Sequence, residues 1–260
     1  MKFIKWANGA PYWQNMRRFF VEPGNIGQKS IRIDSGDDLH HIRKVLRLDK
    51  GDIIQVSDGR RWEYSGEIIG IYDDGAEILI LDKQKFAREP VTKVTLFQGV
   101  PKQGKMDLTV RKTTELGIST IVPVFMDRTV ISDKGNFWKR LVRLRTIAEE
   151  AAKQCGRGIV PEIRQETDFT DMVSRLNKFQ LVLFPYEEEE EKTIKFALRN
   201  QEKKPEKVAI IIGPEGGFSP REAEILKNAQ TECVSLGKTI LRTETAGIAA
   251  LAMCMYELEL

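Results

Sequence analysis

The sequence is poor in cysteine and histidine. Three cysteines stand at positions 155, 233 and 254 of 260 residues, in no metal-binding spacing. So sparse a count is typical of reduced thiols, and Cys233 and Cys254 lie in apolar stretches, so we expect them in the core. The two histidines, His40 and His41, are adjacent. They leave no histidine-based metal site or Ser-His-Asp triad to build, and no metal is expected.

Long hydrophobic runs are absent as well. No apolar run reaches the ~18 residues that a membrane-spanning helix needs, and the amino terminus lacks the continuous apolar stretch of a signal peptide. We therefore expect a soluble, cytoplasmic protein. With 260 residues and 41% hydrophobic content, the chain can bury a large core as one large or two modest domains.

Charge is distributed unevenly along the chain. Residues 83–165 carry 17 lysines and arginines against 8 aspartates and glutamates, a net charge of +9, whereas the whole chain has +3. Basic segments favour a polyanion such as RNA, because neutralised phosphates supply most of the nonspecific affinity. A solvated basic face is the alternative interpretation.

The first part of the chain predicts a small β-barrel over residues 16–83. A short helix is expected near 37–47, and three strands are expected at 52–57, 61–71 and 76–82. A unit of this size suits binding of RNA or of a partner. Residues 84–90 are expected to form a linker. Residues 1–15 fit the barrel pattern poorly and are interpreted as an extension.

Residues 91–260 alternate between strand and helix patterns. Strands are predicted at 92–98, 119–125, 159–163, 180–184, 208–212 and 233–236. Helices are predicted between them at 104–116, 136–155, 168–177, 192–200 and from Ser219, and a last apolar helix, expected to be buried all round, ends the chain. This alternation predicts an α/β domain with a parallel sheet and helices on both faces.

Two glycine-bearing loops leave the carboxyl ends of predicted strands in this domain. Residues 213–217 read GPEGG, and Gly237 follows the strand at 233–236. In parallel α/β sheets, ligands bind at this edge, where glycine lets them approach the backbone. The sequence therefore predicts a ligand site here. Tight turns and helix ends are the alternative explanation.

A third loop resembles a phosphate-binding motif. Residues 99–105 read GVPKQGK after a strand and before a helix, as in a nucleotide triphosphatase. The next residue is Met106, however, where that motif needs a hydroxyl to hold magnesium, and a thioether is a poor ligand for a hard cation. We therefore do not expect a triphosphatase, and Lys102 and Lys105 are better suited to contact RNA phosphates.

Six segments together resemble the bacterial RsmE family, the 16S ribosomal RNA uridine N3-methyltransferases of the SPOUT superfamily. They follow one another between Met16 and Leu260: MRRFFV at 16, HHIRKVLRLDKGD at 40, PKQGKMDLTVRKTTELG at 101, EEAAKQCGR at 149, IIGPEGGFSPRE at 211 and LGKTILRTETAGIAAL at 236. The resemblance implies a PUA-like barrel for RNA, then a SPOUT domain whose last segment forms a trefoil knot, and a homodimer.

The resemblance also implies an S-adenosylmethionine pocket built from the two glycine loops. The positions it carries over to this chain are Leu183, Phe184, Gly213, Pro214, Glu215, Gly216, Gly217, Leu236, Gly237, Ile240, Leu241, Arg242, Thr245 and Ala246. Backbone groups of loops and apolar side chains suit a bent, largely uncharged adenosine.

The implied reaction needs loss of the uracil N3 proton. Arg242 is the candidate for stabilising the uracilate oxygens, and Glu115 and Glu244 are candidate bases, with structural ion pairs as the alternative. The residues expected to contact 16S ribosomal RNA in the small subunit are Arg17, Arg18, Arg43, Arg47, Lys102, Lys105, Lys112 and Arg157. A noncatalytic RNA-binding or ribosome-assembly protein, or a methyltransferase of another RNA, are the competing functions.

Overall fold

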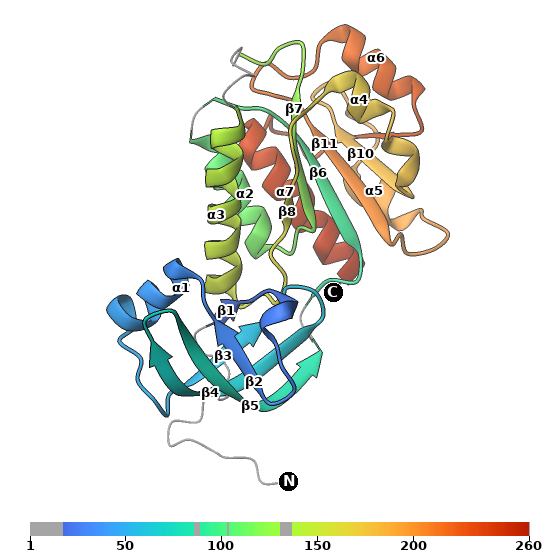
Figure 1. The fold of residues 1–260 in the computed structure, drawn as a ribbon. Helices are drawn as coiled ribbons and strands as arrows, with labels where there is room; N and C mark the ends of the chain where they lie inside the picture. Colours follow the sequence, from blue (N-terminus) through green and yellow to red (C-terminus); the bar gives the residue numbers. More distant parts are fainter. Residues whose placement is uncertain (1–17, 86–88, 103, 131–136, 260) are drawn as a thin grey trace. The chain divides into compact units, whose positions relative to one another are not determined.

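The chain contains two units. The computed structural model describes residues 18–85, 89–102, 104–130 and 137–259 (Figure 1), so Arg17 and residues 1–15 lie outside the described residues. One unit comprises Met1–Glu89 with Gly156–Ile159, and the other comprises Pro90–Cys155 with Val160–Leu260. The sequence pattern had placed Gly156–Ile159 wholly in the second domain. That assignment is corrected by hydrogen bonds, because Ser57 Oγ donates to Gly158 O at 2.6 Å within the first unit.

The first unit is built on one five-stranded sheet with the order β1-β3-β4-β5-β2. Its strands are β1 (Arg18–Phe20), β2 (Ser30–Ile33), β3 (Ile53–Ser57), β4 (Trp62–Tyr72) and β5 (Gly75–Lys85). The remaining elements are η2 (Pro23–Asn25), α1 (Gly36–His40) and the π-helical η3 (His41–Val45). Alternate residues such as Ile54, Val56 and Ile78 point into one apolar core.

The second unit is built on a parallel sheet. Its six-strand path has the order β12-β10-β11-β6-β7-β8, and β9 pairs with β7. The strands are β6 (Lys93–Gly99), β7 (Thr120–Phe125), β8 (Glu162–Ile163), β9 (Thr167–Asp168), β10 (Leu181–Pro185), β11 (Lys207–Ile212) and β12 (Glu232–Val234). Every described pairing in this sheet is parallel, so all carboxyl ends lie at one edge.

Helices cover both faces of this sheet, as the alternation predicted (Figure 1). Successive strand residues alternate between two apolar clusters: Ile210 and Ile212 face one, and Ala209 and Ile211 face the other. The first cluster is closed by α2 (Lys105–Glu115), α3 (Phe137–Cys155), α5 (Ile194–Arg199) and α7 (Thr243–Glu259). The second is closed by α4 (Phe169–Val173) and α6 (Pro220–Asn228), with η4 (Leu176–Lys178) between α4 and β10.

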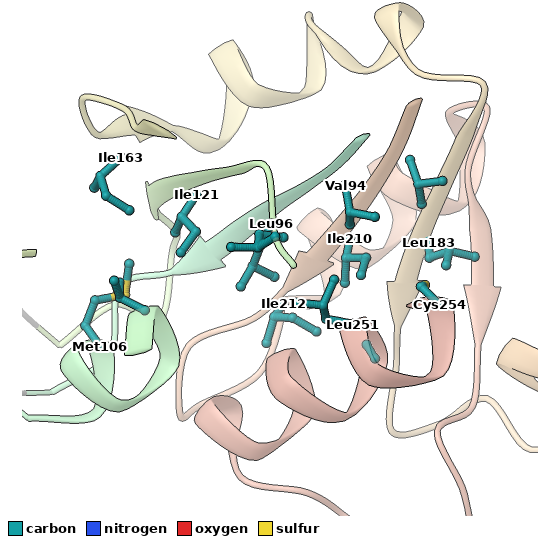
Figure 2. Close-up of a cluster of buried hydrophobic side chains, with 14 of the residues drawn as sticks. Val94, Leu96, Met106, Ile121, Ile163, Leu183, Ile210, Ile212, Leu251 and Cys254 are labelled. Carbon is teal, nitrogen blue, oxygen red and sulfur yellow. The ribbon is translucent and has the colours of Figure 1, made fainter. Parts of the chain in front are cut away.

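Figure 2 shows the first cluster, with Met106 of α2 and Leu251 of α7 against the strands. Met106 is therefore a core residue, in agreement with the rejection of the phosphate-binding motif. Cys254 is fully buried, as expected, and burial raises the pKa of its thiol to about 12. Cys233 is partly buried beside the second cluster, and burial raises its pKa to about 11.

The last helix, α7, is not buried all round, contrary to the expectation. Gly247, Ala250 and Leu251 are buried, but Thr245 and Tyr256 on another side of the helix are exposed. Apolar side chains on that side are therefore only partly covered by the described residues of the single chain.

Candidate functional site

The GPEGG loop follows β11 at the carboxyl edge of the parallel sheet. Gly217 adopts φ +68°, and its N–H donates to Pro214 O at 2.9 Å. A Cβ on Gly217 would lie 2.9 Å from the carboxylate of Glu187, in the loop after β10. Position 217 thus favours glycine for its conformation, whereas the Glu187 carboxylate is the end of an exposed, flexible side chain that can move aside. From the sequence, Glu187 reads as part of a solvated acidic run, with no connection to this loop.

A capping box fixes the helix that follows the loop. Ser219 Oγ accepts the Glu222 N–H at 3.2 Å, and Glu222 accepts the Ser219 N–H at 2.9 Å. Glu222 is 1% exposed and also accepts the Asp127 N–H at 2.9 Å. Because Asp127 follows β7, this carboxylate joins two loops of the same edge. A capping box is visible in sequence, but the partner from β7 is not.

Two further contacts hold the GPEGG loop to the loop after β7. Arg128 Nη1 donates to Gly216 O at 2.7 Å, and Ser219 Oγ donates to Asp127 Oδ2 at 2.6 Å. Neither Asp127 nor Arg128 was predicted as a site residue, because their role depends on strand order rather than on a local motif.

A buried polar chain joins the same loop to the start of α7. Thr243 Oγ1 donates to Gly213 O at 2.6 Å and accepts from Gln98 Nε2 at 2.8 Å. Gln98 is 0% exposed and Thr243 is 6% exposed. The ends of β6 and β11 and the amino end of α7 therefore meet at one threonine hydroxyl.

Lys105 lies between two carboxylates at this edge. Its Nζ is 3.2 Å from Glu215 and 3.5 Å from Glu244. Burial alone would raise the pKa of Glu215, but the Lys102 N–H at 2.9 Å and the Lys105 ammonium outweigh it, and the pKa is lowered. Lys105 was predicted to contact RNA phosphate. In the structure its ammonium forms ion pairs with Glu215 and Glu244 in the loops at this edge.

The other predicted cofactor positions have different exposures. Leu183 and Phe184 are fully buried, so only their backbone can face a ligand at the edge. Leu236, Leu241 and Ala246 are half-buried, and Gly237 has φ +139°. Arg242 and Thr245 are exposed, and Ile240 is 85% exposed. The loop after β12 thus presents apolar and cationic side chains beside the GPEGG loop.

Glu115 does not lie at this edge. It ends α2, whose first residue is Lys105, so about 15 Å of helix separates the two positions. Its carboxylate pairs with Lys112 at 2.9 Å. One chain therefore does not bring Glu115 together with Arg242 and Glu244, and Lys112 is engaged as well.

The structure corrects two predicted RNA contacts. Arg18 pairs with Glu63 and donates to Gln55 Oε1 at 2.9 Å, and its side chain is 8% exposed. Arg157 pairs with Glu89 at 2.8 Å, and both side chains are 8% exposed. Buried ion pairs leave neither guanidinium available to a phosphate.

The remaining predicted RNA contacts are accessible to different degrees. Arg43 donates to Tyr72 O and lies 3.4 Å from Asp73. Arg47 is exposed and has φ +51°. Lys102 is exposed, and Arg17 lies outside the described residues. No helix in the part of the chain that the structure describes is long and apolar enough to cross a membrane.

Comparisons with known proteins identify the family of this chain. Residues 87–255 match the RNA methyltransferase domain family, and residues 34–81 match the RNA methyltransferase PUA domain. The chain is 31% identical over 251 residues to ribosomal RNA small subunit methyltransferase E of Bacillus subtilis (strain 168), covering 94% of this chain and 98% of that protein. This chain belongs to the ribosomal RNA small subunit methyltransferase E family. The resemblance seen in the sequence is confirmed.

Solved structures agree with this family and with the predicted α/β fold. The chain is 27% identical to ribosomal RNA small subunit methyltransferase E of Neisseria gonorrhoeae bound to S-adenosyl methionine, with TM-score 0.81 and 93% and 97% of the two chains covered. The protein Lpg2936 of Legionella pneumophila, in complex with the bound cofactor SAM, is 29% identical, also with TM-score 0.81 and the same coverage.

Proposed function

We propose that this protein transfers a methyl group from S-adenosylmethionine to N3 of a uridine in 16S ribosomal RNA of the small subunit, in the cytoplasm. The observation that supports this most is the cluster of loops at the carboxyl edge, in which GPEGG is joined to the start of α7 through Thr243. Relatives of the same family and fold are methyltransferases, and two solved ones hold the cofactor.

In this proposal the cofactor occupies the space between the GPEGG loop and the loop after β12. Backbone groups of Gly213–Gly217 and of Leu236–Leu241 would bind the adenosine, with the apolar Leu236, Leu241 and Ala246 against it. The fit rests on bare backbone at Gly217 and on half-buried apolar side chains, both suited to an uncharged base and ribose.

In this reaction the protein has to align the two substrates, stabilise charge on the uracil oxygens and accept one proton. When bound, the cofactor supplies an electrophilic methyl group; the bond from sulfur to that carbon breaks as the bond from N3 forms, and the N3 proton must leave. Exposed Arg242 would stabilise charge on the uracil oxygens, and Glu244, 8% exposed at the first turn of α7, would accept the proton. Glu115 is not used, because it lies at the opposite end of α2.

Homodimerisation is part of the proposal and is supported by α7. Its uncovered side carries Thr245, Ile248, Ala249, Ala252 and Tyr256, which follow one another at helical spacing and are half-buried or exposed. A second copy would bury this stripe. We also retain the trefoil knot as a prediction for the segment that leads into α7.

Calorimetric titration of the full chain with S-adenosylmethionine, with Mg-ATP in parallel, tests the site first. We expect binding of the former alone, followed by methyl transfer from labelled cofactor to small ribosomal subunits. Gly217→Ala should weaken cofactor binding about tenfold, because alanine is strained at φ +68° and would distort the GPEGG loop. Gly156→Ala is the matched control, since Gly156 also has positive φ but lies outside this loop.

The remaining outcomes discriminate between functions. Cofactor binding without methyl transfer to any RNA, or binding to RNA without cofactor, would favour the noncatalytic RNA-binding protein. Transfer to other RNA but not to 16S ribosomal RNA would keep the enzyme class and overturn the substrate.

A further inference from the structure

The first unit carries a row of aromatic and basic side chains on one face of β4 and β5. In the antiparallel register, Trp62 pairs with Lys85 and Tyr64 pairs with Lys83. Because side chains alternate between faces along a strand, these four residues share one face, which we call the β4–β5 platform. The intervening Glu63, on the other face, pairs with Arg18.

Cations lie over the aromatic rings of this platform. Lys83 Nζ is 4.3 Å from the centroid of the Trp62 ring and 5.5 Å from that of Tyr64, and Lys85 Nζ is 5.9 Å from Trp62. The guanidinium of Arg61 is 5.4 Å from the same indole. Lys83, Lys85 and Arg61 are all exposed, so their charges face solvent and remain available to a ligand.

A cavity of about 590 Å³ opens beside the platform. Its lining includes Pro23, Ile26, Gln28, Tyr64, Ile80 and Lys83. A β-bulge at Ser65/Gly66 shifts the register so that Ile80 pairs with Gly66, which brings Ile80 to the same face as Tyr64. The lining thus combines apolar side chains and Tyr64, which is 4% exposed and packs in the core of this unit, with the amide of Gln28, the ammonium of Lys83 and the carboxylate of Asp58.

The charge around this cavity is mainly positive. Exposed Lys29 and Arg60 stand beside lining residues, in addition to the platform lysines and Arg61. Asp58 itself lines the cavity, and exposed Glu22 and Asp82 also stand beside lining residues. Asp58 Oδ1 accepts the N–H groups of Arg60, Arg61 and Trp62 at 2.9, 2.7 and 2.8 Å, so its carboxylate orders the turn that carries the arginines.

We propose that this cavity and the β4–β5 platform hold one unpaired nucleotide of single-stranded RNA. The base would enter the apolar cavity beside Tyr64 or stack on Trp62, and its flanking phosphates would pair with Lys83, Lys85 and Arg61. Aromatic faces interleaved with cations are how proteins hold unpaired nucleotides, because every base has a face for stacking and every phosphate a charge. A wholly apolar partner would leave five cations without counter-charge.

This site rests on the proposed function only for its ligand class, RNA. It lies within the first unit and uses none of the residues assigned to the cofactor or to the chemistry. It also replaces Arg18 as the basis for RNA binding by this unit, since Arg18 is buried in an ion pair.

The test measures binding of a fluorescein-labelled single-stranded oligouridylate to the full chain by anisotropy, at several salt concentrations. The double variant Lys83→Gln/Lys85→Gln should bind about tenfold more weakly at low salt, and the slope of log affinity against log salt should fall by about 1.4, at roughly 0.7 per lost phosphate contact. Lys50→Gln, an exposed lysine of the same unit outside the platform, should change little.

Stacking is tested separately from charge. Trp62→Ala should weaken binding roughly tenfold with the salt slope unchanged, and Trp62→Phe should restore most of it. Gln28→Trp, on an exposed position, should fill the opening and weaken binding without disturbing the core. Unchanged affinity in the lysine, Trp62 and Gln28 variants would overturn the proposal, including in favour of a protein partner for this face.

Failure here is distinguishable from failure of the proposed function. Cofactor titration should be unaffected in every platform variant, because the cofactor residues lie in the other unit. Loss of RNA binding with intact cofactor binding supports the platform, and it does so even if methyl transfer is never observed.

Discussion

At the scale of single residues, Thr243 connects several parts of the site through one hydroxyl. That hydroxyl is buried, donates to Gly213 O and accepts from Gln98 Nε2. Gln98 Oε1 is buried and has no hydrogen-bond partner among the described residues, and a Cβ on Gly247 would lie 2.9 Å from it. Small side chains in α7 therefore let this polar group sit against the helix, and the network already has one unsatisfied atom.

Thr243→Val should break this network. The valine leaves Gly213 O and Gln98 Nε2 without their partner, at a cost of about 1–3 kcal/mol in unfolding free energy. Chemical denaturation measures this, and the control Thr170→Val, on an exposed helical position, should cost less than about 0.5 kcal/mol. Cofactor affinity should fall in parallel, since Gly213 begins the GPEGG loop. Equal stability of the two variants would refute the role of the hydroxyl.

Arg242 should act in the reaction rather than in folding, because it is exposed at the amino end of α7. We expect Arg242→Ala to lower kcat by about two orders of magnitude, the scale typical of removing one charge-stabilising donor, with Tm unchanged. Arg242→Lys should recover part of that loss. If Arg242→Ala leaves both cofactor binding and methyl transfer intact, our assignment is wrong.

Residue roles were the hardest part to predict from sequence. The GPEGG loop and the Ser219 capping box were visible as local patterns, because each uses neighbours in the chain. Asp127, Arg128 and Glu187 were missed, since strand order alone brings them to GPEGG. Local charge also misled: Arg18 and Arg157 looked like surface cations, but their partners Glu63 and Glu89 are distant in sequence.

At the scale of elements, the end of α7 is hydrogen-bonded to the residues that begin the second unit. Glu259 accepts the N–H groups of Val91 and Thr92 at 3.0 and 2.9 Å and lies 3.0 Å from Lys204 Nζ. Burial alone would raise the pKa of Glu259, but these bonds outweigh it and lower the pKa to about 2. The first and last elements of the unit are thus joined by one carboxylate.

This contact should make stability depend on pH in the acid range. The folded pKa is depressed, so the contribution is complete above the ordinary carboxyl pKa of about 4.5 and is lost as pH falls toward 2. Since the Glu259 side chain is 16% exposed and its partner Lys204 is 49% exposed, solvent screens part of this contribution, and we expect only about 1–2 kcal/mol. Glu259→Gln should therefore be less stable than wild type at pH 7 and equal to it near pH 2 in denaturation experiments.

Exposed Glu202 provides the control for this effect. Glu202→Gln should leave the pH dependence of the unfolding free energy unchanged. A difference between Glu259→Gln and wild type that persists at pH 2 would mean that ionisation of Glu259 is not its source.

Elements themselves were well predicted in the second unit, because buried parallel strands are continuous apolar runs and helices lie between them. The last helix was the exception. When every side of a helix is apolar, its sequence does not indicate which side packs against the rest of the chain. In the structure, one side of α7 is exposed and carries Tyr256, which is 68% exposed.

At the scale of the whole molecule, this uncovered side predicts the oligomeric state. Tyr256→Arg should convert the proposed dimer into a monomer, because an arginine in the apolar stripe would lose its hydration on association. Sedimentation velocity measures the mass directly. Asn200→Arg, an exposed position on the neighbouring α5 region, should remain dimeric. A wild-type chain that sediments as a monomer at all concentrations would remove the dimer from the proposal.

Net charge was the least direct guide at this scale. The net +9 of residues 83–165 already counts acidic residues of the segment such as Asp107 and Glu149, but its Lys105 also lies 3.2 Å from Glu215 and 3.5 Å from Glu244, which lie outside the segment. The cations best placed for RNA lie instead in β4 and β5, where the aromatic neighbours rather than the charge count mark them.

The four residues Gly156–Ile159 have a consequence for the order of synthesis. They belong to the first unit, where Glu89 accepts the N–H groups of Gly158 and Ile159 and pairs with buried Arg157. A nascent chain that ends at residue 89 therefore lacks part of its own first unit and holds Glu89 without its partner. Cotranslational folding of the amino-terminal unit must wait until α3 has been made, so its completion and that of the first half of the catalytic unit are coupled in time.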